Sequence, residues 1–272
     1  IARMLGKPLM PHQQYVMDVA LEIDPDTGKL AYNDITVLMG RQQGKTTMVL
    51  PKILHRALGF GTIPQRILYT AQTSDKAREK WRDLYVAGVQ QSPLAEMIEK
   101  GSPRLRLNAE QLKFSTGSTF VPVTPTAKTG GTGDTVDEPH IDEAWAFEDS
   151  AVEQAMSPAM VTRDQPQLWV ESTAKRQPKG APHNPKFAGY LRSRIAAGRA
   201  RVEAGVIRDT CYFEWSAPEQ ADPQDPRTWW ATMPAMGHTV TEEAKRGQFA
   251  RMDLADFCAL FLGWWLRDAQ LR

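Results

Sequence analysis

The 272-residue sequence predicts an α/β domain with a mainly parallel central sheet flanked by helices. Short β-branched runs alternate with helix-patterned segments along the first half of the chain, the order that builds parallel βαβ units. A glycine-containing turn joins the first such run directly to the first helix. Hydrophobic residues make up 42% of the chain and charged residues 24%, so disordered, collagenous and coiled-coil classes are excluded.

The first two predicted strands each lead into a helix. Residues 35–39 (ITVLM) form a β-branched run, and residues 45–58 follow with apolar side chains at helical spacing. Residues 66–70 (RILYT) predict the second strand, and Thr73 offers an N-cap for the helix after it. The inner face of that helix is expected to carry Ala77, Trp81, Leu84 and Tyr85.

The rest of the chain predicts further strands, one basic helix and a helical tail. The strands are expected at residues 105–107, 112–115, 119–123, 167–171 and 211–215, with the second and third paired as a hairpin. Asn184 and Pro185 predict the start of the helix. Its inward side chains would be Phe187, Tyr190, Leu191, Ile195 and Val202. A proline-rich acidic stretch then precedes the helical tail that ends in residues 261–265.

Charge is distributed unevenly, although the net charge is only +1. Residues 134–153 contain eight carboxylates and no lysine or arginine, whereas residues 175–208 contain nine basic residues and only one acidic residue. Two cysteines and five histidines occur without metal-ligand spacing, so neither a disulfide framework nor a zinc site is expected. The absence of a long apolar run and of a signal-peptide pattern predicts an intracellular protein with no membrane partner.

The strongest local motif is the loop at residues 40–47 (GRQQGKTT), between the first predicted strand and the first helix. A loop in this position can bind phosphate, because backbone N–H groups and the helix N-terminus face the anion. The residues predicted to bind nucleotide there are Gly40, Arg41, Gln42, Gln43, Gly44, Lys45, Thr46 and Thr47. Lys45 would contact the phosphates and Thr46 would bind Mg²⁺. The usual pattern places its first glycine at the position of Met39, so an ordinary capped turn is the alternative.

Nucleotide hydrolysis also needs a carboxylate on the metal ion and a group that activates water. Asp142 and Glu143 offer both in order, with Asp142 on Mg²⁺ and Glu143 as the general base. The residues before this pair are polar and include a proline, which is unusual for a buried central strand. Asp137 and Glu138 therefore form a rival acidic pair.

These residues together resemble the ATPase domain of tailed-bacteriophage terminase large subunits, the motors that package DNA into capsids. A phosphate loop with an early basic residue occurs in that family, which implies a catalytic role for Arg41 beside Lys45. The Asp142-Glu143 pair takes the Walker B and catalytic glutamate positions. Pro11-His12-Gln13 is similar to the adenine-binding motif, which implies that Gln13 contacts adenine, and Ser172-Thr173-Ala174 is similar to the coupling motif, which implies a catalytic role for Thr173.

The resemblance implies a P-loop NTPase fold of the ASCE type with a small C-terminal lid or linker subdomain. We expect the ATPase core at residues 1–175, the end of the core and the lid at residues 176–272, and no nuclease domain in this sequence. The implied activity is ATP hydrolysis coupled to translocation of double-stranded DNA, with ATP and Mg²⁺ as cofactors. The implied partners are double-stranded DNA, further copies of the chain in a ring, a portal protein and a small terminase subunit, in the cytoplasm of an infected bacterial host.

Family members can also supply a basic residue to the nucleotide of a neighbouring subunit. Here the candidate is Lys128, in a glycine-rich stretch before the acidic pair, with Arg104, Arg163 and Arg176 as competitors. The basic helix at residues 186–201 could contact DNA phosphates or be a solvated face. Two other functions remain open: a helicase-type nucleic-acid ATPase, and a module that binds nucleotide only in order to fold or assemble.

Overall fold

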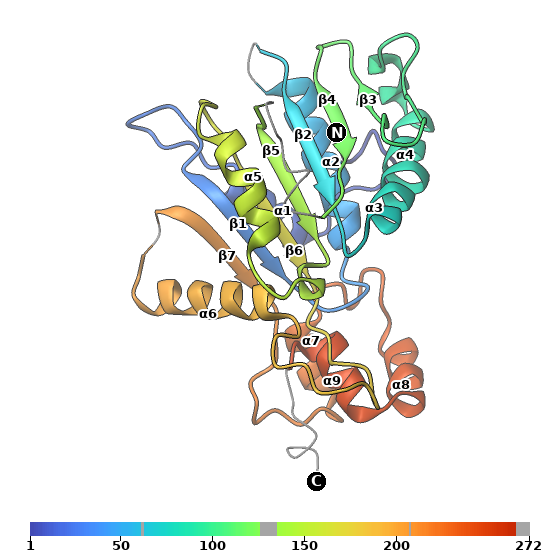
Figure 1. Ribbon diagram of the computed structural model, residues 1–272. Helices are drawn as coiled ribbons and strands as arrows, with labels where there is room; N and C mark the ends of the chain where they lie inside the picture. Colours follow the sequence, from blue (N-terminus) through green and yellow to red (C-terminus); the bar gives the residue numbers. More distant parts are fainter. Residues whose placement is uncertain (61–62, 126–134, 207, 265–272) are drawn as a thin grey trace.

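A computed structural model describes the chain except for residues 61–62, 126–134, 207 and 265–272. Within these described ranges, seven strands form one sheet in the order β3-β4-β2-β5-β6-β1-β7, in which only the β3–β4 pair is antiparallel (Figure 1). The strands are β1 (Tyr32–Leu38), β2 (Arg66–Thr70), β3 (Leu112–Lys113), β4 (Thr119–Pro122), β5 (Glu138–Asp142), β6 (Leu168–Ser172) and β7 (Asp209–Glu214). The predicted mainly parallel sheet is confirmed.

The helices cover both faces of this sheet and form a separate group at one end. The α-helices are α1 (Pro11–Ala20), α2 (Lys45–Gly59), α3 (Ser74–Lys80), α4 (Ala87–Gln90), α5 (Ala151–Met160), α6 (Gly189–Glu203), α7 (Pro226–Thr232), α8 (Glu242–Arg251) and α9 (Leu254–Leu262). A π-helix, η1 (Trp81–Val86), and two 3-10 helices, η2 (Pro93–Met97) and η3 (Ala144–Ala146), complete the elements. None of the helices in the described ranges has the length and apolar character needed to span a bilayer.

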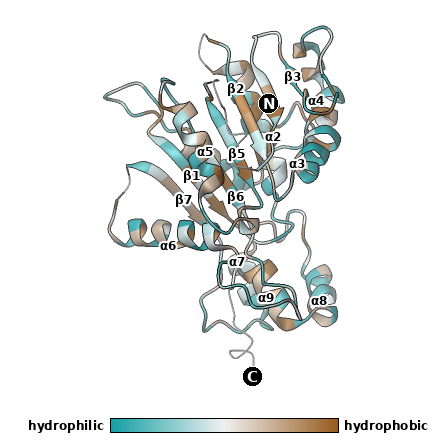
Figure 2. Cartoon of the chain, in the orientation of Figure 1, coloured by the Kyte–Doolittle hydropathy of each residue, from teal (hydrophilic) through white to brown (hydrophobic). Residues whose placement is uncertain are grey.

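Separate apolar clusters form on the two faces of the sheet. Helices α1, α2 and α3 with η1 pack on one face, where Ile53, Tyr69 and Trp81 are buried. Helices α5 and α6 pack on the other face, around Ile141, Val170 and Leu191. In Figure 2, the inner strand β2 is coloured hydrophobic, whereas the outer helix α3 is mostly hydrophilic. Both faces of the central strands are therefore buried, as expected for a parallel sheet.

The polar strand β5 lies at the centre of the sheet and is buried. This burial is possible because its charged side chains are paired, in part with Lys52 of α2. The Glu138 carboxylate binds the Lys52 ammonium from α2, and its Oε1 lies 2.9 Å from Nε2 of His140. His140 Nδ1 lies 2.9 Å from Oε1 of Glu171 on β6, and its ring stacks on Trp169. Burial alone would lower the pKa of His140, but the two carboxylates outweigh it and raise that pKa to about 9. A strand that is poor by hydropathy is thus stabilised by a buried ion network.

The sequence misplaced some features near β3 and α3. Residues 105–107 do not form the predicted strand; the nearest pairing is an isolated antiparallel bridge between Arg104 and Gln111. Trp81 and Tyr85 are buried as expected, but Leu84 is 42% exposed. The reason is η1, because the wider turn of a π-helix shifts the spacing of side chains away from the α-helical pattern. The hairpin was predicted correctly, with Leu112 opposite Phe120.

Helix α6 begins later than the sequence predicts. The Asn184 side chain accepts a hydrogen bond from the Lys186 backbone in a turn, and the helix starts only after Ala188, which is left-handed with φ 54°. Gly189 then passes so close to the backbone of Glu148 that a Cβ atom would lie 2.2 Å from its carbonyl oxygen. At the other end of α6, Val202 is 65% exposed rather than inward.

Helices α7, α8 and α9 form a small group with its own apolar cluster, which includes Trp229, Phe257 and Phe261. Figure 1 shows this group below the main body, at the carboxyl ends of the parallel strands. We call α7, α8, α9 and the segments that join them, residues 226–262, the lid. The expected boundary at residue 175 falls between β6 and α6, and both α6 and β7 pack with the sheet.

Candidate active site

The predicted phosphate loop joins the end of β1 to the start of α2, at the carboxyl edge of the sheet. Gln42 and Gly44 adopt left-handed conformations, with φ 61° and 86°. Gly44 is the N-cap of α2 and has no side chain that could cap the helix. A Cβ atom at Gly44 would lie 2.5 Å from Nε2 of Gln13, so both its conformation and its surroundings require glycine. No N-cap side chain therefore occupies the first backbone N–H groups of α2, which are the groups that bind an anion at a helix N-terminus.

Lys45 lies at the first position of α2, and its ammonium is bound by the protein. Its Nζ donates to the carbonyl oxygens of Met39 (2.9 Å) and Gly40 (3.0 Å) and to the hydroxyl of Thr173. Burial lowers the pKa of Lys45 to about 8, against the opposing effect of the Asp142 and Glu143 carboxylates. A group whose charge is already desolvated is suited to bind a phosphate oxygen, because less hydration is lost on binding.

Thr46 and Thr47 follow Lys45 in the first turn of α2, and both are partly buried. The Thr47 hydroxyl donates to the Gly44 carbonyl oxygen at 2.8 Å and accepts from Gln13 Nε2 at 2.9 Å. Thr47 therefore stabilises the turn itself. Thr46 stays the predicted Mg²⁺ ligand.

Gln13 binds the phosphate loop rather than an open pocket. Its Nε2 donates to both the Gly44 carbonyl oxygen and Thr47, its Oε1 accepts from the Met10 backbone, and the residue is only 2% exposed. His12 next to it contacts the Gln43 carbonyl oxygen at 2.8 Å. Both amide hydrogens of Gln13 are therefore used inside the protein. Its predicted contact with adenine stays a prediction, and such a contact would require release of a loop hydrogen bond.

The lid contacts the phosphate loop at its first residues, which explains the position of the first glycine. A Cβ atom on Gly40 would lie 2.9 Å from the carbonyl oxygen of Phe261 in α9. The Arg41 backbone N–H donates to the Leu260 carbonyl oxygen at 2.8 Å, and Gln43 accepts from the Ala235 N–H at 2.9 Å. Glycine is required at position 40 by the backbone of the lid. The Arg41 side chain is exposed.

Asp142 ends β5, and its carboxylate is almost fully coordinated by protein donors. Its Oδ2 accepts from the Tyr69 hydroxyl at 2.6 Å and from the Lys80 ammonium at 2.8 Å, and its Oδ1 accepts from the Glu143 N–H. Although burial opposes it, the Asp142 carboxylate raises the pKa of Lys80. Neither Lys80 nor Tyr69 was found from the sequence. The signal available there was only the position of each residue, at the end of α3 and within β2.

Glu143 follows in a left-handed conformation, with φ 57°, which is uncommon for a residue with a side chain. Its Oε2 accepts a hydrogen bond from the indole of Trp145, and its Oε1 lies 3.4 Å from Nζ of Lys80. The Lys175 ammonium lies 3.7 Å above the Trp145 ring. The Glu143 side chain is 29% exposed, in contrast to the buried Asp142. Trp145 is a third residue of this site that the sequence did not indicate.

The rival acidic pair lies at the opposite end of β5. Asp137 precedes the strand, and its carboxylate accepts from the Arg66 N–H at 2.8 Å and pairs with Arg163. Glu138 is bound by Lys52 and His140 in the buried network. Both carboxylates are therefore used structurally at the amino edge of the sheet, away from the phosphate loop.

Strand β6 connects the phosphate loop to the acidic pair. It lies between β1 and β5 in the sheet, with Ser172 paired with Leu38 and Glu171 paired with Asp142. Beyond its end, the Thr173 hydroxyl donates to the Met39 carbonyl oxygen at 3.0 Å. The Ser172 hydroxyl accepts from the Trp145 N–H at 3.2 Å. The predicted coupling residues thus contact both halves of the site.

The candidates for a basic residue acting on a neighbouring subunit are scattered. Lys128 lies outside the described residues. Arg163 binds Asp137 at the amino edge of the sheet, Arg176 pairs with Asp253 at 3.1 Å, and Arg104 is exposed. In the basic helix α6, Arg194 turns inward to Asp34 on β1, and Arg199 pairs with Glu214. Several of the basic residues at positions 175–208 therefore form ion pairs within the chain.

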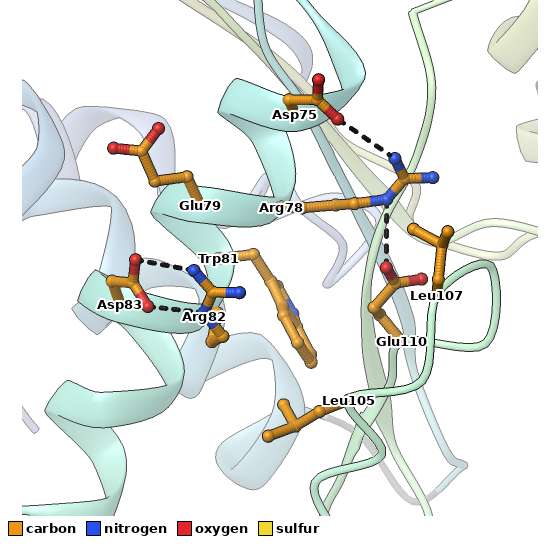
Figure 3. A pocket seen from close by; sticks show the side chains of 9 residues that line it. All are labelled: Asp75, Arg78, Glu79, Trp81, Arg82, Asp83, Leu105, Leu107 and Glu110. Carbon is orange, nitrogen blue, oxygen red and sulfur yellow. Dashed lines mark hydrogen bonds and ion pairs between the residues drawn. The ribbon is translucent and has the colours of Figure 1, made fainter.

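A groove of about 670 Å³ lies between α3, η1 and the segment that contains Leu105 and Leu107 (Figure 3). Five of its charged side chains are paired with one another: Arg78 contacts Asp75 and Glu110, and Arg82 contacts Asp83. None of the predicted site residues lines this groove.

The donors at the phosphate loop fit Mg²⁺. A carboxylate from Asp142 and a hydroxyl from Thr46 are hard oxygen ligands, and one lone pair of Asp142 Oδ1 is not engaged by the Glu143 N–H. Within the described residues, no group of three or more histidine, cysteine, aspartate or glutamate side chains could hold a metal ion. Mg²⁺ commonly needs only one or two carboxylates when phosphate oxygens complete its shell, so the sparse donor set is consistent with this ion.

No protein-family model and no curated protein matches the sequence. Solved structures do match it over nearly its whole length. The large terminase of bacteriophage HK97 superposes with a TM-score of 0.72 at 20% identity, covering 95% of this chain and 51% of that one. The chain has the fold of a phage large-terminase ATPase domain.

Two further structures support the terminase-type fold. The ATPase domain of the large terminase of Thermus phage P74-26 has a TM-score of 0.55 at 16% identity, covering 97% of this chain and 96% of that domain. The large terminase of a thermophilic bacteriophage, in complex with ATP-γ-S, has a TM-score of 0.57 at 14% identity, covering 95% of this chain and 53% of that one. The chain thus spans about half the length of the two large terminases. The predicted resemblance and the ASCE-type fold are confirmed.

Proposed function

We propose that this chain is the ATP-hydrolysing motor domain of a viral DNA-packaging terminase and uses Mg²⁺. The observation that carries the proposal is the convergence of the phosphate loop and the acidic pair at one edge of the sheet. Lys45 follows β1 and Asp142 ends β5, and β6 lies between these two strands. Thr173, just beyond the end of β6, binds the lysine. Solved large terminases with ADP or ATP-γ-S share this fold, which supports nucleotide binding by this chain.

In the proposed reaction, Lys45 exchanges its contacts with Met39 and Gly40 for phosphate oxygens, and Arg41 adds a second positive charge. Mg²⁺ would be held by Thr46 and Asp142 and would neutralise charge on the phosphates. Glu143 acts as the general base. Its carboxylate lies beside Lys80 and is oriented by Trp145, so it can accept a proton from water.

Coupling to DNA would begin at Thr173. Because its hydroxyl accepts from Lys45, a movement of the lysine toward phosphate removes a hydrogen bond from the end of β6. The lid would move with the same loop, because it contacts Gly40, Arg41 and Gln43. We infer that translocation of double-stranded DNA uses this movement in a ring of subunits, with a portal protein and a small terminase subunit as partners in the infected bacterial host.

The test is release of phosphate from ATP, measured with and without Mg²⁺ and with and without double-stranded DNA. The proposal expects Mg²⁺-dependent release that DNA stimulates. A helicase-type ATPase would instead respond to single-stranded DNA and unwind duplexes. Nucleotide binding with no phosphate release, in rings as well as in monomers, would identify the non-hydrolysing assembly module and exclude the motor.

A further inference from the structure

The lid contacts four consecutive residues of the phosphate loop, and one of these contacts involves a buried charge. Gly40, Arg41 and Gln43 meet backbone groups of the lid. Gln42 differs, because its side chain contacts two side chains of α8. Its Oε1 accepts from the Gln248 amide at 3.2 Å and lies 3.5 Å from the ammonium of Lys245.

Lys245 is completely buried, and it is the one buried residue of α8. Its Nζ donates to Oε1 of Gln248 at 2.8 Å and lies 3.7 Å from the ring centre of Phe261. Among the residues that the structure describes, no carboxylate lies within ion-pair distance of this ammonium. Burial lowers the pKa of Lys245 to about 8. Lysine is seldom buried without an anion, because desolvation of its charge costs free energy.

The position of this charge relates it to the nucleotide. Gln42 is left-handed and exposed, and it lies between Arg41 and Gln43 in the loop that would surround the phosphates. Phosphates bound there would add several negative charges near the Gln42 contact of a buried ammonium whose partners, among the described residues, are amide oxygens and an aromatic ring. Attraction between opposite charges weakens less with distance where water is excluded, and Lys245 is buried.

We propose that Lys245 is a positioning residue that holds Gln42, and that nucleotide in the phosphate loop strengthens this contact and draws the lid onto the core. The inference rests on the proposed nucleotide site and adds a residue outside every predicted motif. The effect is reciprocal: if nucleotide stabilises the charged lid contact, the contact raises the affinity for nucleotide by the same factor. A residue that only packed against Phe261 would produce neither effect.

The test compares four proteins in the presence of Mg²⁺: the wild type, Lys245→Met, Lys245→Arg and the control Arg246→Met. Methionine keeps the length and the packing on Phe261 but removes the charge, and arginine keeps the charge. Arg246 is next in α8 but contacts Glu242 at the surface. Affinities for ADP and ATP-γ-S are measured by calorimetry, and protection of α8 by ADP is measured by hydrogen exchange.

We expect Lys245→Met to bind ADP about 10-fold more weakly, within the usual range of coupling between two sites. It should also lose the protection of α8 that ADP produces in the wild type, while Lys245→Arg keeps most of both effects and Arg246→Met keeps them fully. Gln42→Leu should reproduce the loss, and the double variant should lose little more, because both changes remove the same contact.

Wild-type affinity and wild-type protection of α8 in folded Lys245→Met would overturn the inference. If that variant does not fold, Gln42→Leu decides, because Gln42 is exposed; unchanged binding and protection there would overturn it equally. A wild-type protein that binds neither nucleotide would overturn the proposed function as well. Binding that is equal in all variants would overturn only the role of Lys245.

Discussion

The ammonium of Lys45 and the hydroxyl of Thr173 are hydrogen-bonded to each other, and both donate to the carbonyl oxygen of Met39. A residue beyond the end of β6 thereby contacts the lysine of the phosphate loop. Thr173 is buried, so its hydroxyl depends on hydrogen bonds within the protein. A displacement of Lys45 would remove one of these hydrogen bonds. The site thus has a direct link between phosphate binding and the strand that leads to α6.

The first prediction is that Lys45→Ala loses nucleotide affinity and hydrolysis together. The lysine is expected to contact the phosphates in the ground state as well as in the transition state, so its removal affects both. Calorimetry with ADP and a phosphate-release assay measure the two effects. Lys76→Ala, which removes an exposed lysine paired with Glu79 on α3, is the matched control and should change neither. Unchanged turnover in Lys45→Ala would remove the loop from the site.

The second prediction separates the two acidic pairs. Glu143→Gln keeps the size of the side chain and removes the base, so nucleotide should still bind while turnover falls about 100-fold or more. Glu138→Gln should act differently, because it leaves Lys52 and His140 without the carboxylate that they share. Breaking a buried pair in this way costs about 3–5 kcal/mol of stability.

Thermal unfolding and single-turnover assays on both variants distinguish these effects. Glu143→Gln should unfold at nearly the wild-type temperature, and Glu138→Gln should unfold well below it. A folded Glu138→Gln that binds ATP without hydrolysing it, beside an active Glu143→Gln, would reverse the assignment.

The third prediction concerns the shifted glycine. In Gly40→Ala, the new Cβ atom would lie 2.9 Å from the carbonyl oxygen and 3.2 Å from the Cα atom of Phe261, so the backbone of the lid must move. Overpacking of this kind costs about 1–3 kcal/mol. We expect a lower unfolding temperature and faster hydrogen exchange in α9. Gly59→Ala is the control, because a Cβ atom there meets no other atom within 4 Å.

The fourth prediction is a pH dependence of stability that comes from His140. The folded protein raises the pKa of His140 to about 9, from about 6.5 in an unfolded chain. Because folding raises the pKa of His140, protonated His140 stabilises the fold fully below about pH 6.5. This stabilisation is lost as the pH rises through about 9. A tenfold change in proton affinity corresponds to about 1.4 kcal/mol, so the full effect on the free energy of unfolding is on the order of 3 kcal/mol.

His140→Asn is the comparison, because asparagine keeps a hydrogen-bonding group without the titrating charge. The difference in unfolding free energy between the wild type and this variant should shrink between about pH 6.5 and pH 9. Lys52, Glu138 and Glu171 surround the same position, so the change in this difference with pH reports the titration of His140 together with its coupling to these groups. A constant difference across this range would show that His140 is neutral in the folded state.

The alternation of strands and helices could be predicted from the sequence, because the pattern of apolar residues depends on local geometry. The loop at residues 40–47 and the pair at residues 142–143 were found for the same reason, since each lies at the end of a strand. Strand β5 shows the limit: its polar residues look unsuitable until Lys52 from α2 lies beside them. The exposed Leu84 likewise depends on a π-helix that the α-helical spacing does not reveal.

The surroundings of the site could not be predicted, because they depend on residues distant in the sequence. Tyr69 and Lys80 reach Asp142 from 73 and 62 residues away, and neither has a motif around it. From the sequence, Gly40 looks like a phosphate-loop glycine displaced by one position. The structure shows instead that glycine is needed there because the backbone of α9 at Phe261 leaves no room for a Cβ atom. Such contacts follow only from the three-dimensional arrangement of the elements.

The last prediction is that Lys128 acts in trans, on nucleotide bound by a neighbouring subunit. It lies outside the described residues, so the prediction rests on the sequence and on the terminase resemblance. Two of the other candidates, Arg163 and Arg176, are less suitable, because they pair with Asp137 and Asp253. A basic residue supplied by a partner is worth on the order of 1,000-fold in turnover. An isolated monomer should therefore hydrolyse ATP slowly, and an assembled ring much faster.

The decisive measurement mixes two inactive proteins. Lys128→Ala keeps an intact nucleotide pocket but has no basic residue to donate, and Lys45→Ala has the reverse defect. If Lys128 acts in trans, mixed rings regain part of the activity, because each Lys45→Ala subunit can serve the pocket of a Lys128→Ala neighbour. Rings shown to be mixed but still inactive would indicate a role within one subunit. Full activity of Lys128→Ala alone would make exposed Arg104 the next residue to test, because Arg163 and Arg176 would each have to leave a carboxylate, Asp137 or Asp253, in order to reach a neighbour.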